Sequence, residues 1–241
     1  MEEHDQILDE DSEFTFHCHD GLDCFGTCCR DINIFLTPYD VLRLKNFLRL
    51  SSGGFLARYT LRVPVHQSGF SFVQIKMSEE DSLKCPFITP KGCRVYPERP
   101  WACRIAPVKM LDGKKYSFCF ESSFCHGLNE PKVQTVKEWL GDQGLEIYGA
   151  MEKRFGEIPL RVKLSGDRET DEKFAEFFFM ACYDLDGFRD YLAHRPSLFE
   201  NTAFRGNRPE PAELDDVQLM KFAFELLAEG PEGLKTLLPA E

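Results

Sequence analysis

Nine of the ten cysteines in this 241-residue chain fall into two groups in its first half. The first group consists of Cys18, Cys24, Cys28 and Cys29, and the second consists of Cys85, Cys93, Cys103, Cys119 and Cys125. Cysteine thiolates are ligands for zinc and for iron–sulfur clusters. Clustered thiols in a reducing compartment are more often metal ligands than disulfides, so the sequence predicts a metal-binding protein.

The spacing of the cysteines bears on the choice of metal. Neither group contains the Cys-x-x-Cys pair that is typical of structural zinc sites. Iron–sulfur clusters accept more varied spacings, because their four thiolates come from separate loops. We therefore favour an iron–sulfur cluster as the cofactor, with zinc as the second candidate. A disulfide-stapled exported domain is the alternative interpretation of the same cysteines.

Cys28 and Cys29 are neighbours in the sequence. Adjacent side chains in extended backbone point to opposite sides, so such a pair seldom reaches one tetrahedral ion. Either the two thiols serve different centres, or one of them is a ligand and the other packs in the core. His17, His19 and His126 flank cysteines and are optional ligands or proton donors.

A basic segment accompanies the second cysteine group. Residues 84–115 carry eight Lys or Arg against two acids, a local balance of +6. Within it, Arg99 and Arg104 could donate hydrogen bonds to cluster sulfurs or bind an anionic ligand, and Tyr96 and Trp101 would shield the site. The alternative is a proline-rich turn whose arginines are satisfied by other groups. A nucleic-acid groove is a further interpretation of the basic segment.

Composition and charge limit the possible partners. The formal net charge of -11 argues against broad binding to nucleic acid or to anionic membranes. The first residues lack the features of a secretory signal, and no apolar run reaches the roughly 18 residues of a membrane span. We expect a cytoplasmic protein with a metal ion or cluster as its partner, no nucleic acid and no membrane.

Several elements must position these thiols. Thr37 is the expected N-cap of a helix, with Pro38 at its first position and Asp40 reaching back to the cap, and this helix should end near residues 51–54. Two short strands are expected around residues 67–69. Five prolines interrupt the second cysteine group and favour an irregular chain wrapped around a metal.

The sequence after Pro131 has helical periodicity. Apolar residues at three- and four-residue spacings predict helices at 132–140, 145–155, 171–183, 186–193 and 213–228. The expected fold class is α+β, with an irregular cysteine-rich unit and a small β-sheet packed against a mainly helical C-terminal half. The expected domains are an acidic flexible tail at 1–13, a cysteine-cluster domain at 14–130 and a helical region at 131–241.

Two runs of residues carry a family resemblance. CFGTCCRDINIFLT and CPFITPKGCRVYPERPWACRIAP resemble the YkgJ-type cysteine-cluster family, a zinc- or iron-chelating domain with a CxxCxxCC signature. The resemblance covers residues 18–125, and its most specific part runs from Cys85 to Arg104. It implies a set of eight ligands, in which Cys119 or Cys125 completes the other seven thiols. The opening spacing, Cys18-x5-Cys24-x3-Cys28, departs from the family pattern.

The leading function is metal binding, with a role in electron transfer or metal handling. Similar clusters occur in flagellin lysine methylases, so a cluster-dependent lysine methylase-like enzyme is the first alternative. Against it, no glycine-rich loop after a strand marks a nucleotide or S-adenosylmethionine pocket, and we lean against an enzyme. A zinc-stabilised protein interaction module is the second alternative.

Overall fold

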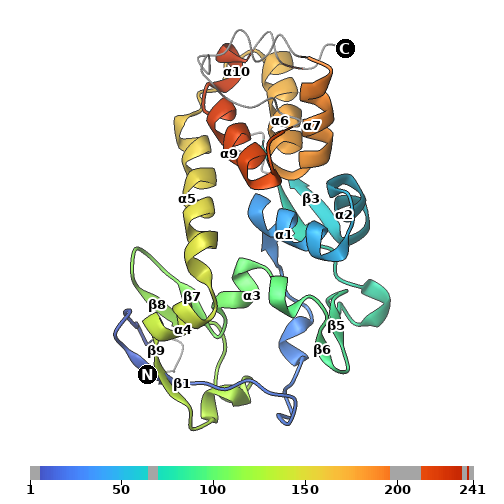
Figure 1. Ribbon diagram of the computed structural model, residues 1–241. Coiled ribbons are helices and arrows are strands. Elements are labelled where there is room, and N and C mark those ends of the chain that lie inside the picture. The colour runs from blue at the N-terminus through green and yellow to red at the C-terminus, as the bar shows by residue number, and fades with distance from the viewer. Residues whose placement is uncertain (1–5, 65–69, 196–212, 235–237, 239–241) are drawn as a thin grey trace. The chain divides into compact units, whose positions relative to one another are not determined.

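The computed structural model describes residues 6–64, 70–195, 213–234 and 238 (Figure 1). The chain forms two compact units. The first, which we call the cysteine unit, consists of residues 1–36 and 75–150. The second, the helical unit, consists of residues 37–74 and 151–241. The fold class is α+β with a mainly helical C-terminal half, as predicted.

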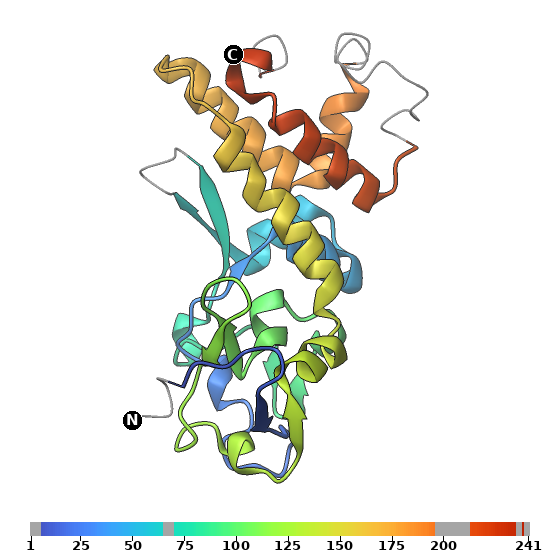
Figure 2. The ribbon, with the colours of Figure 1, turned by 90° about the vertical axis from the view of Figure 1, so that its left-hand side faces the viewer.

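Short antiparallel strand pairs build the cysteine unit. β1 (Glu13–Thr15) lies beside β9 (Val133–Thr135), as Figure 2 shows, with Phe14 opposite Gln134. The other pairs are β5 (Ile88–Thr89) with β6 (Gly92–Cys93), and β7 (Val108–Met110) with β8 (Tyr116–Phe118). The remaining elements are β2 (Phe35–Leu36), α3 (Trp101–Ile105), α4 (Val136–Asp142) and the 3-10 turns η2 (Thr27–Cys29), η3 (Glu79–Asp81), η4 (Tyr96–Glu98) and η5 (His126–Asn129).

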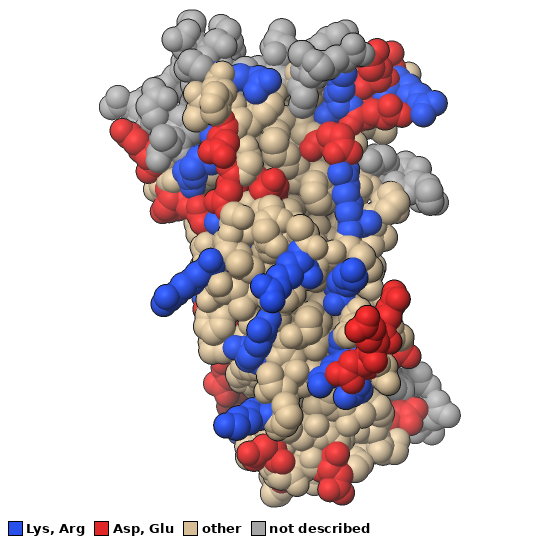
Figure 3. Space-filling model, turned by 90° about the vertical axis from the view of Figure 1, so that its right-hand side faces the viewer, with Lys and Arg blue, Asp and Glu red and all other residues tan. Residues whose placement is uncertain are grey.

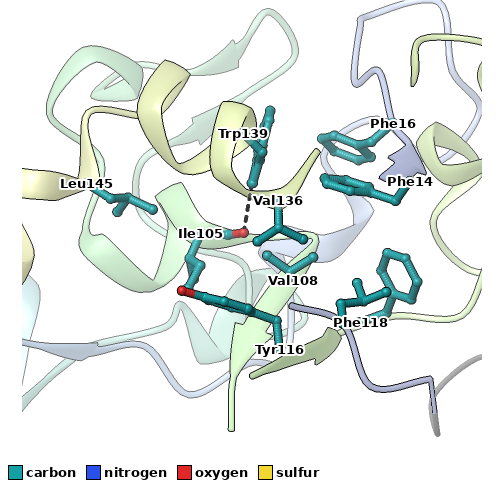
Figure 4. Packing of buried hydrophobic residues seen from close by; sticks show 10 residues of the cluster. Phe14, Phe16, Ile105, Val108, Tyr116, Phe118, Val136, Trp139 and Leu145 are labelled. Carbon is teal, nitrogen blue, oxygen red and sulfur yellow. Dashed lines mark hydrogen bonds between the residues drawn. The ribbon is translucent and has the colours of Figure 1, made fainter. Parts of the chain in front are cut away.

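An apolar core fixes these strand pairs (Figure 4). The Trp139 ring meets Phe16 edge to face at 5.1 Å, and its Nε1 donates to the carbonyl oxygen of Ile105 at 3.0 Å. Val108 and Val136 are completely buried between these groups. Buried aromatic rings contribute both apolar area and directional packing. The cysteine unit therefore has an apolar core besides its thiols.

The first described residues are attached to this unit. Leu8 is buried and exchanges both backbone hydrogen bonds with Tyr116, at 2.8 and 2.9 Å. A flexible tail was predicted for residues 1–13, of which 1–5 lie outside the described residues. After the Leu8 bridge to β8, the carbonyls of Glu10 and Ser12 accept from the N–H groups of Lys137 and Val136.

The helical unit begins with the predicted capped helix, α1 (Pro38–Leu48). The Thr37 hydroxyl accepts from the Asp40 N–H at 3.1 Å, and the Asp40 carboxylate accepts from the Thr37 N–H at 2.8 Å. This reciprocal capping box satisfies two N–H groups that the first turn leaves without helical partners. The predicted start of the helix is confirmed.

The predicted end of this helix at residues 51–54 is wrong. α1 ends at Leu48, and Arg49 takes the left-handed conformation with a φ of 56°. Ser51 then caps a second helix, α2 (Ser52–Tyr59), by accepting from the Gly54 N–H at 3.1 Å. A serine N-cap is more decisive than the low helix propensity of the two glycines that follow it.

Two strands follow, as predicted. They are β3 (Thr60–Pro64) and β4 (Ser71–Ile75). The predicted turn at residues 67–69 lies outside the described residues. β3 begins directly after α2, at Thr60.

The five predicted helical stretches each contain a helix. The bounds are α4 (Val136–Asp142), α5 (Leu145–Arg161), α6 (Arg168–Tyr183), α7 (Leu185–Ala193) and α9 (Asp216–Leu227), followed by α10 (Gly230–Gly233). Residues 133–135 form β9 instead of the start of α4, because they pair with β1. α6, α7 and α9 pack against one another (Figure 1).

The phenylalanine stripe of α6 is part of the core. Phe174, Phe177, Phe178 and Cys182 each have an exposed fraction of 0%. The Phe178 ring lies 4.4 Å from the ring of Phe70. The stripe therefore packs in the core of the helical unit, and Cys182 is a buried core residue.

The surface carries charges of both signs. The face in Figure 3 shows both Lys or Arg and Asp or Glu side chains. Within the described residues, no helix is both long and apolar enough to cross a membrane.

Candidate metal centre

The first thiol loop closes through a left-handed glycine. Gly26, with a φ of 78°, precedes the η2 turn that contains Cys28 and Cys29. The Thr27 N–H donates to the Cys24 carbonyl at 2.9 Å, and the Cys29 N–H donates to the Gly26 carbonyl at 3.2 Å. Because a 3-10 helix has three residues per turn, successive side chains are about 120° apart. Cys28 and Cys29 therefore leave the backbone in different directions.

A backbone bridge connects the two cysteine groups. The Cys85 N–H donates to the carbonyl oxygen of Cys29 at 2.9 Å. Beside it, Arg30 and Lys84 form an antiparallel bridge. The last thiol of the first group and the first thiol of the second group are thus held together by the main chain.

The β5–β6 hairpin places Cys93 against the same loop. Cys93 pairs with Ile88, and Gly92 before it has a φ of 98°. A Cβ atom on residue 92 would lie 3.1 Å from the Phe25 ring, and a Cβ atom on Gly26 would lie 3.5 Å from Ile88. Both glycines allow the loop and the hairpin to approach closely.

Arg104 holds the turn that carries Cys103 in α3. Its Nε donates to the Arg99 carbonyl at 2.9 Å, its Nη1 donates to the Gln143 carbonyl at 3.0 Å, and its Nη2 donates to the Pro97 carbonyl. The guanidinium is buried and lies over the Tyr148 ring. These contacts are structural, and binding of a cluster by Arg104 stays a prediction.

Arg99 is placed differently. It donates to the Tyr96 carbonyl at 2.7 Å and to the Gln143 side chain, and it lies 3.9 Å from the centre of the Tyr96 ring. Burial lowers its pKa, while the nearby Tyr96, Cys103 and Cys93 act to raise it. Arg99 is therefore close enough to two thiols for its charge to act on them.

All ten cysteines are free thiols, and electrostatic interactions divide most of them into two sets. A hydrogen bond from Cys29 lowers the pKa of Cys28 to about 7. The same hydrogen bond raises the pKa of Cys29, with further increases from burial and from the charges of Cys28, Cys85 and Cys103. Cys28 and Cys29 are the point at which the two sets meet.

Cys29, Cys85, Cys93 and Cys103 form what we call the inner set. Burial raises the pKa of Cys85, and the charge of Cys93 raises it further. Burial also raises the pKa of Cys93, whereas the Val95 N–H and the charges of Arg99 and Arg94 lower it. These cations favour the thiolate form that binds metal.

Cys18, Cys24, Cys28 and Cys125 form the outer set. Loss of hydration raises the pKa of Cys18, followed by the charges of Cys28 and Cys24. Burial raises the pKa of Cys125 to about 11, and the same two thiols add to it. The backbone explains this proximity, because the His17 N–H donates to the carbonyl of Gly127, two residues after Cys125.

Cys119 belongs to neither set. Burial raises its pKa to about 11, and the one charge that acts on it is that of Lys109. Its N–H donates to the Pro107 carbonyl at 2.7 Å, which positions it beside the β7–β8 hairpin. Of the two thiols that competed for the eighth ligand position, Cys125 is the one that lies near other thiols.

The distances between ligand atoms test which metal the thiols fit. Within the described residues, no three cysteine sulfurs lie mutually within 4.8 Å. With Zn–S bonds of about 2.3 Å, a tetrahedral zinc ion holds its sulfurs about 3.8 Å apart. An iron–sulfur cluster is larger, because its thiolates bind different iron atoms. The half-buried thiols and the arginine charges beside them fit a thiophilic metal centre, of zinc or of iron.

A second group of metal-binding side chains was not predicted as a unit. Atoms of His17, His19 and Glu130 all lie within 4.8 Å of one another. The two histidines were recognised because they flank Cys18. Nothing in the sequence around Glu130 indicates a metal ligand. Glu130 is the C-cap of η5, and only the folded chain brings η5 to the first cysteine group.

The comparisons with known proteins agree with the cysteine pattern. Residues 17–126 match the model of the CxxCxxCC family, whose description is "Putative zinc- or iron-chelating domain". No curated protein and no solved structure matches the chain. The matched segment contains the nine clustered cysteines, both arginines of the motif and most of the cysteine unit. Residues 17–126 therefore match the CxxCxxCC family, a cysteine-rich domain that is described as zinc- or iron-chelating.

Proposed function

We propose that the cysteine unit binds two iron–sulfur clusters and transfers electrons through them. The outer set would hold one cluster and the inner set the other. The observation that carries this proposal is the pair Cys28 and Cys29 on one turn. Besides their mutual hydrogen bond, Cys28 acts on Cys18 and Cys125, whereas Cys29 is affected by Cys85 and Cys103. Adjacent thiols with separate neighbours are better explained by two centres than by one.

The preference for iron–sulfur over zinc rests on the spacing of the thiols. Across the described part of the chain, the sulfurs are not gathered at the distances of a single tetrahedral ion. The missing Cys-x-x-Cys pair supports the same choice, because compact zinc sites usually take two ligands from one tight turn. The family description covers both metals, so the experiment below is designed to separate them.

Iron–sulfur clusters supply one-electron redox chemistry when bound. The protein contributes thiolates from the η2 turn, the β5–β6 hairpin and α3, together with the positive charge of Arg94 and Arg99 near Cys93. Positive charge beside a cluster favours the reduced, more anionic form. Eight of the nine clustered thiols are half-buried and Cys18 is exposed, so the outer set is the more accessible to a redox partner.

The test is anaerobic purification followed by iron, sulfide and zinc analysis and an absorption spectrum. We expect iron and acid-labile sulfide in equal amounts, with a broad visible band that dithionite weakens. Cys119→Ser is the matched control, because this thiol lies outside both sets and its loss should leave the band unchanged. Stoichiometric zinc without a visible band would replace this proposal with a structural zinc module.

A further inference from the structure

We propose that His17, His19 and Glu130 form a third metal site, which binds one divalent transition-metal ion of the zinc class through nitrogen and oxygen. This site is separate from the thiol sets in its ligands and in its chemistry. Two imidazoles and one carboxylate are the ligands of open zinc sites, in which a remaining position accepts water or substrate.

The distances between the ligand atoms fit a single ion. The atoms of the three side chains lie within 4.8 Å of one another, and His19 Nε2 lies 3.6 Å from Glu130 Oε2. With bonds of about 2.1 Å to nitrogen and oxygen, a tetrahedral ion holds its ligand atoms about 3.4 Å apart. Among the described residues, no three cysteine sulfurs meet the same 4.8 Å limit.

One backbone carbonyl holds two of the ligands in place. The oxygen of Gly127 accepts from the His17 N–H at 3.0 Å and from the Glu130 N–H at 3.3 Å. A Cβ atom at residue 127 would lie 3.0 Å from the Phe16 ring and 3.1 Å from the His17 carbonyl, so a glycine is needed for this approach. His17 and Glu130 are thus fixed through the backbone and do not depend on each other's side chains.

The surrounding strands make this arrangement rigid. The Phe16 N–H donates to the Lys132 carbonyl at 2.9 Å, and the Gln134 side chain donates back to the Phe16 carbonyl at 3.0 Å. Phe16 itself is buried against Trp139. Ligands on a rigid scaffold lose little conformational entropy when an ion binds.

The ring of His19 already faces Glu130 with the nitrogen that would bind the ion. Its Nδ1 accepts from the Gly21 N–H at 3.2 Å, which leaves Nε2 directed at the carboxylate. An ion on Nε2 requires the ring proton on Nδ1, so the Gly21 N–H would have to release this bond. The side chains of His19 and Glu130 are 37% and 31% exposed, so water and ions can reach them.

The ligand types predict which ions bind here. Neutral imidazole and carboxylate suit zinc and ferrous iron, whereas the thiol sets suit softer centres. Occupancy of this site would also be independent of the thiols, since none of its three ligands is a cysteine. The proposal therefore predicts that a metal ion stays bound at this site when the thiol sites are altered.

The test counts zinc on the full-length, iron-loaded protein. Zinc is added without oxygen, weakly held ions are removed by desalting, and metals are measured per chain. We expect one zinc retained by the wild type, and affinity reduced more than about 100-fold in Glu130→Gln and His19→Asn, since even outer-shell partners contribute 10–100-fold. Glu121→Gln and His194→Asn are matched controls that keep their zinc. Equal zinc in wild type and Glu130→Gln would overturn the proposal.

The comparison of zinc content between the wild type and Glu130→Gln remains valid if the thiols hold zinc instead of iron. Glu130→Gln leaves every cysteine in place, so the difference of one zinc reports the His17 site alone. A second measurement needs no variant: diethyl pyrocarbonate modification of the wild type is mapped by mass spectrometry with and without zinc. Zinc should protect His17 and His19 but not His194. Unchanged modification of His17 and His19 would contradict the site.

Discussion

The backbone N–H of Cys85 donates to the carbonyl oxygen of Cys29 across 2.9 Å. This bond joins the end of the first cysteine group to the start of the second, although α1, α2 and the strands β2, β3 and β4 lie between them in the chain. It places Cys29 with the inner set, while Cys28 on the same turn faces the outer set. The proposed division of the thiols follows from this junction.

Replacing a single thiol, in either the inner or the outer set, should remove half of the iron. Cys93→Ser deletes an inner thiol and Cys125→Ser an outer one, so each variant should retain about one of the two proposed clusters. Iron and sulfide analysis, with electron paramagnetic resonance of the dithionite-reduced protein, measures this.

Cys119→Ser is the control for these two variants and should keep its full iron content. Circular dichroism checks that each variant is folded. A folded Cys93→Ser variant without any iron would contradict two separate centres and favour a single shared one.

Replacement of Arg104 should destabilise the cysteine unit. Arg104→Met removes three donors from the carbonyls of Pro97, Arg99 and Gln143 and leaves a partly buried site without these hydrogen bonds. Hydrogen bonds from charged groups contribute roughly 1.5–3 kcal/mol each and are not additive, so we expect a loss of about 3 to 5 kcal/mol. Denaturant unfolding of the metal-loaded protein measures the change.

Lys91→Met is the matched control for Arg104, because it removes an exposed cation from the same basic segment. It should change the free energy of unfolding by less than about 0.5 kcal/mol. A second variant, Arg104→Lys, keeps the charge but cannot reach three carbonyls with one ammonium group. If Arg104→Lys is as stable as the wild type, the proposed role of the three hydrogen bonds is wrong.

Gly92→Ala should weaken both the fold and metal retention. The φ of 98° disfavours a side chain, and the added Cβ would also press on Phe25 at 3.1 Å. Strained backbone of this kind costs on the order of 1–3 kcal/mol. Gly113→Ala is the control, because Gly113 also has a positive φ, of 58°, but a Cβ there meets nothing within 4 Å. Thermal unfolding and iron release to a chelator should separate the two variants.

Acid should weaken the helical unit through Asp216. Lys45 is buried and lies 3.1 Å from carboxylate oxygens of both Asp186 and Asp216. Burial acts to raise the pKa of Asp216, but hydrogen bonds and the charge of Lys45 outweigh it, and its pKa is lowered. A lowered pKa means that its stabilisation is present above the unfolded value of about 3.9 and is lost as the pH falls through the folded value.

Asp216→Asn should therefore lower stability at pH 7 by about 1 to 3 kcal/mol and reduce the loss of stability below pH 4. Glu169→Gln is the control, because Glu169 forms an exposed helical pair with Lys173 at 2.7 Å that contributes little. Denaturant unfolding of both variants at pH 7 and pH 3.5 measures the effect. Parallel pH curves for Asp216→Asn and the wild type would contradict the linkage.

Features with local causes could be predicted from the sequence. The thiols identified a metal-binding domain, because ligand chemistry belongs to the residue type. The Thr37 cap was predictable because a capping box needs only two residues three positions apart, here Thr37 and Asp40. The end of α1 could not be predicted from the sequence. Ser51 favours the start of a helix, whereas the glycines at 53 and 54 disfavour helix at the same place.

Tertiary structure decided which ligands are neighbours. The sequence left Cys119 and Cys125 as equal candidates, and the His17–Gly127 hydrogen bond brings the second of them near Cys24 and Cys28. The same carbonyl of Gly127 accepts from the Glu130 N–H, and Glu130 lies near His17 and His19 although it is far from them along the chain. Sequence alone thus determined the kind of chemistry and several local helix starts, while the grouping of ligands depended on hydrogen bonds between distant segments, which no local pattern encodes.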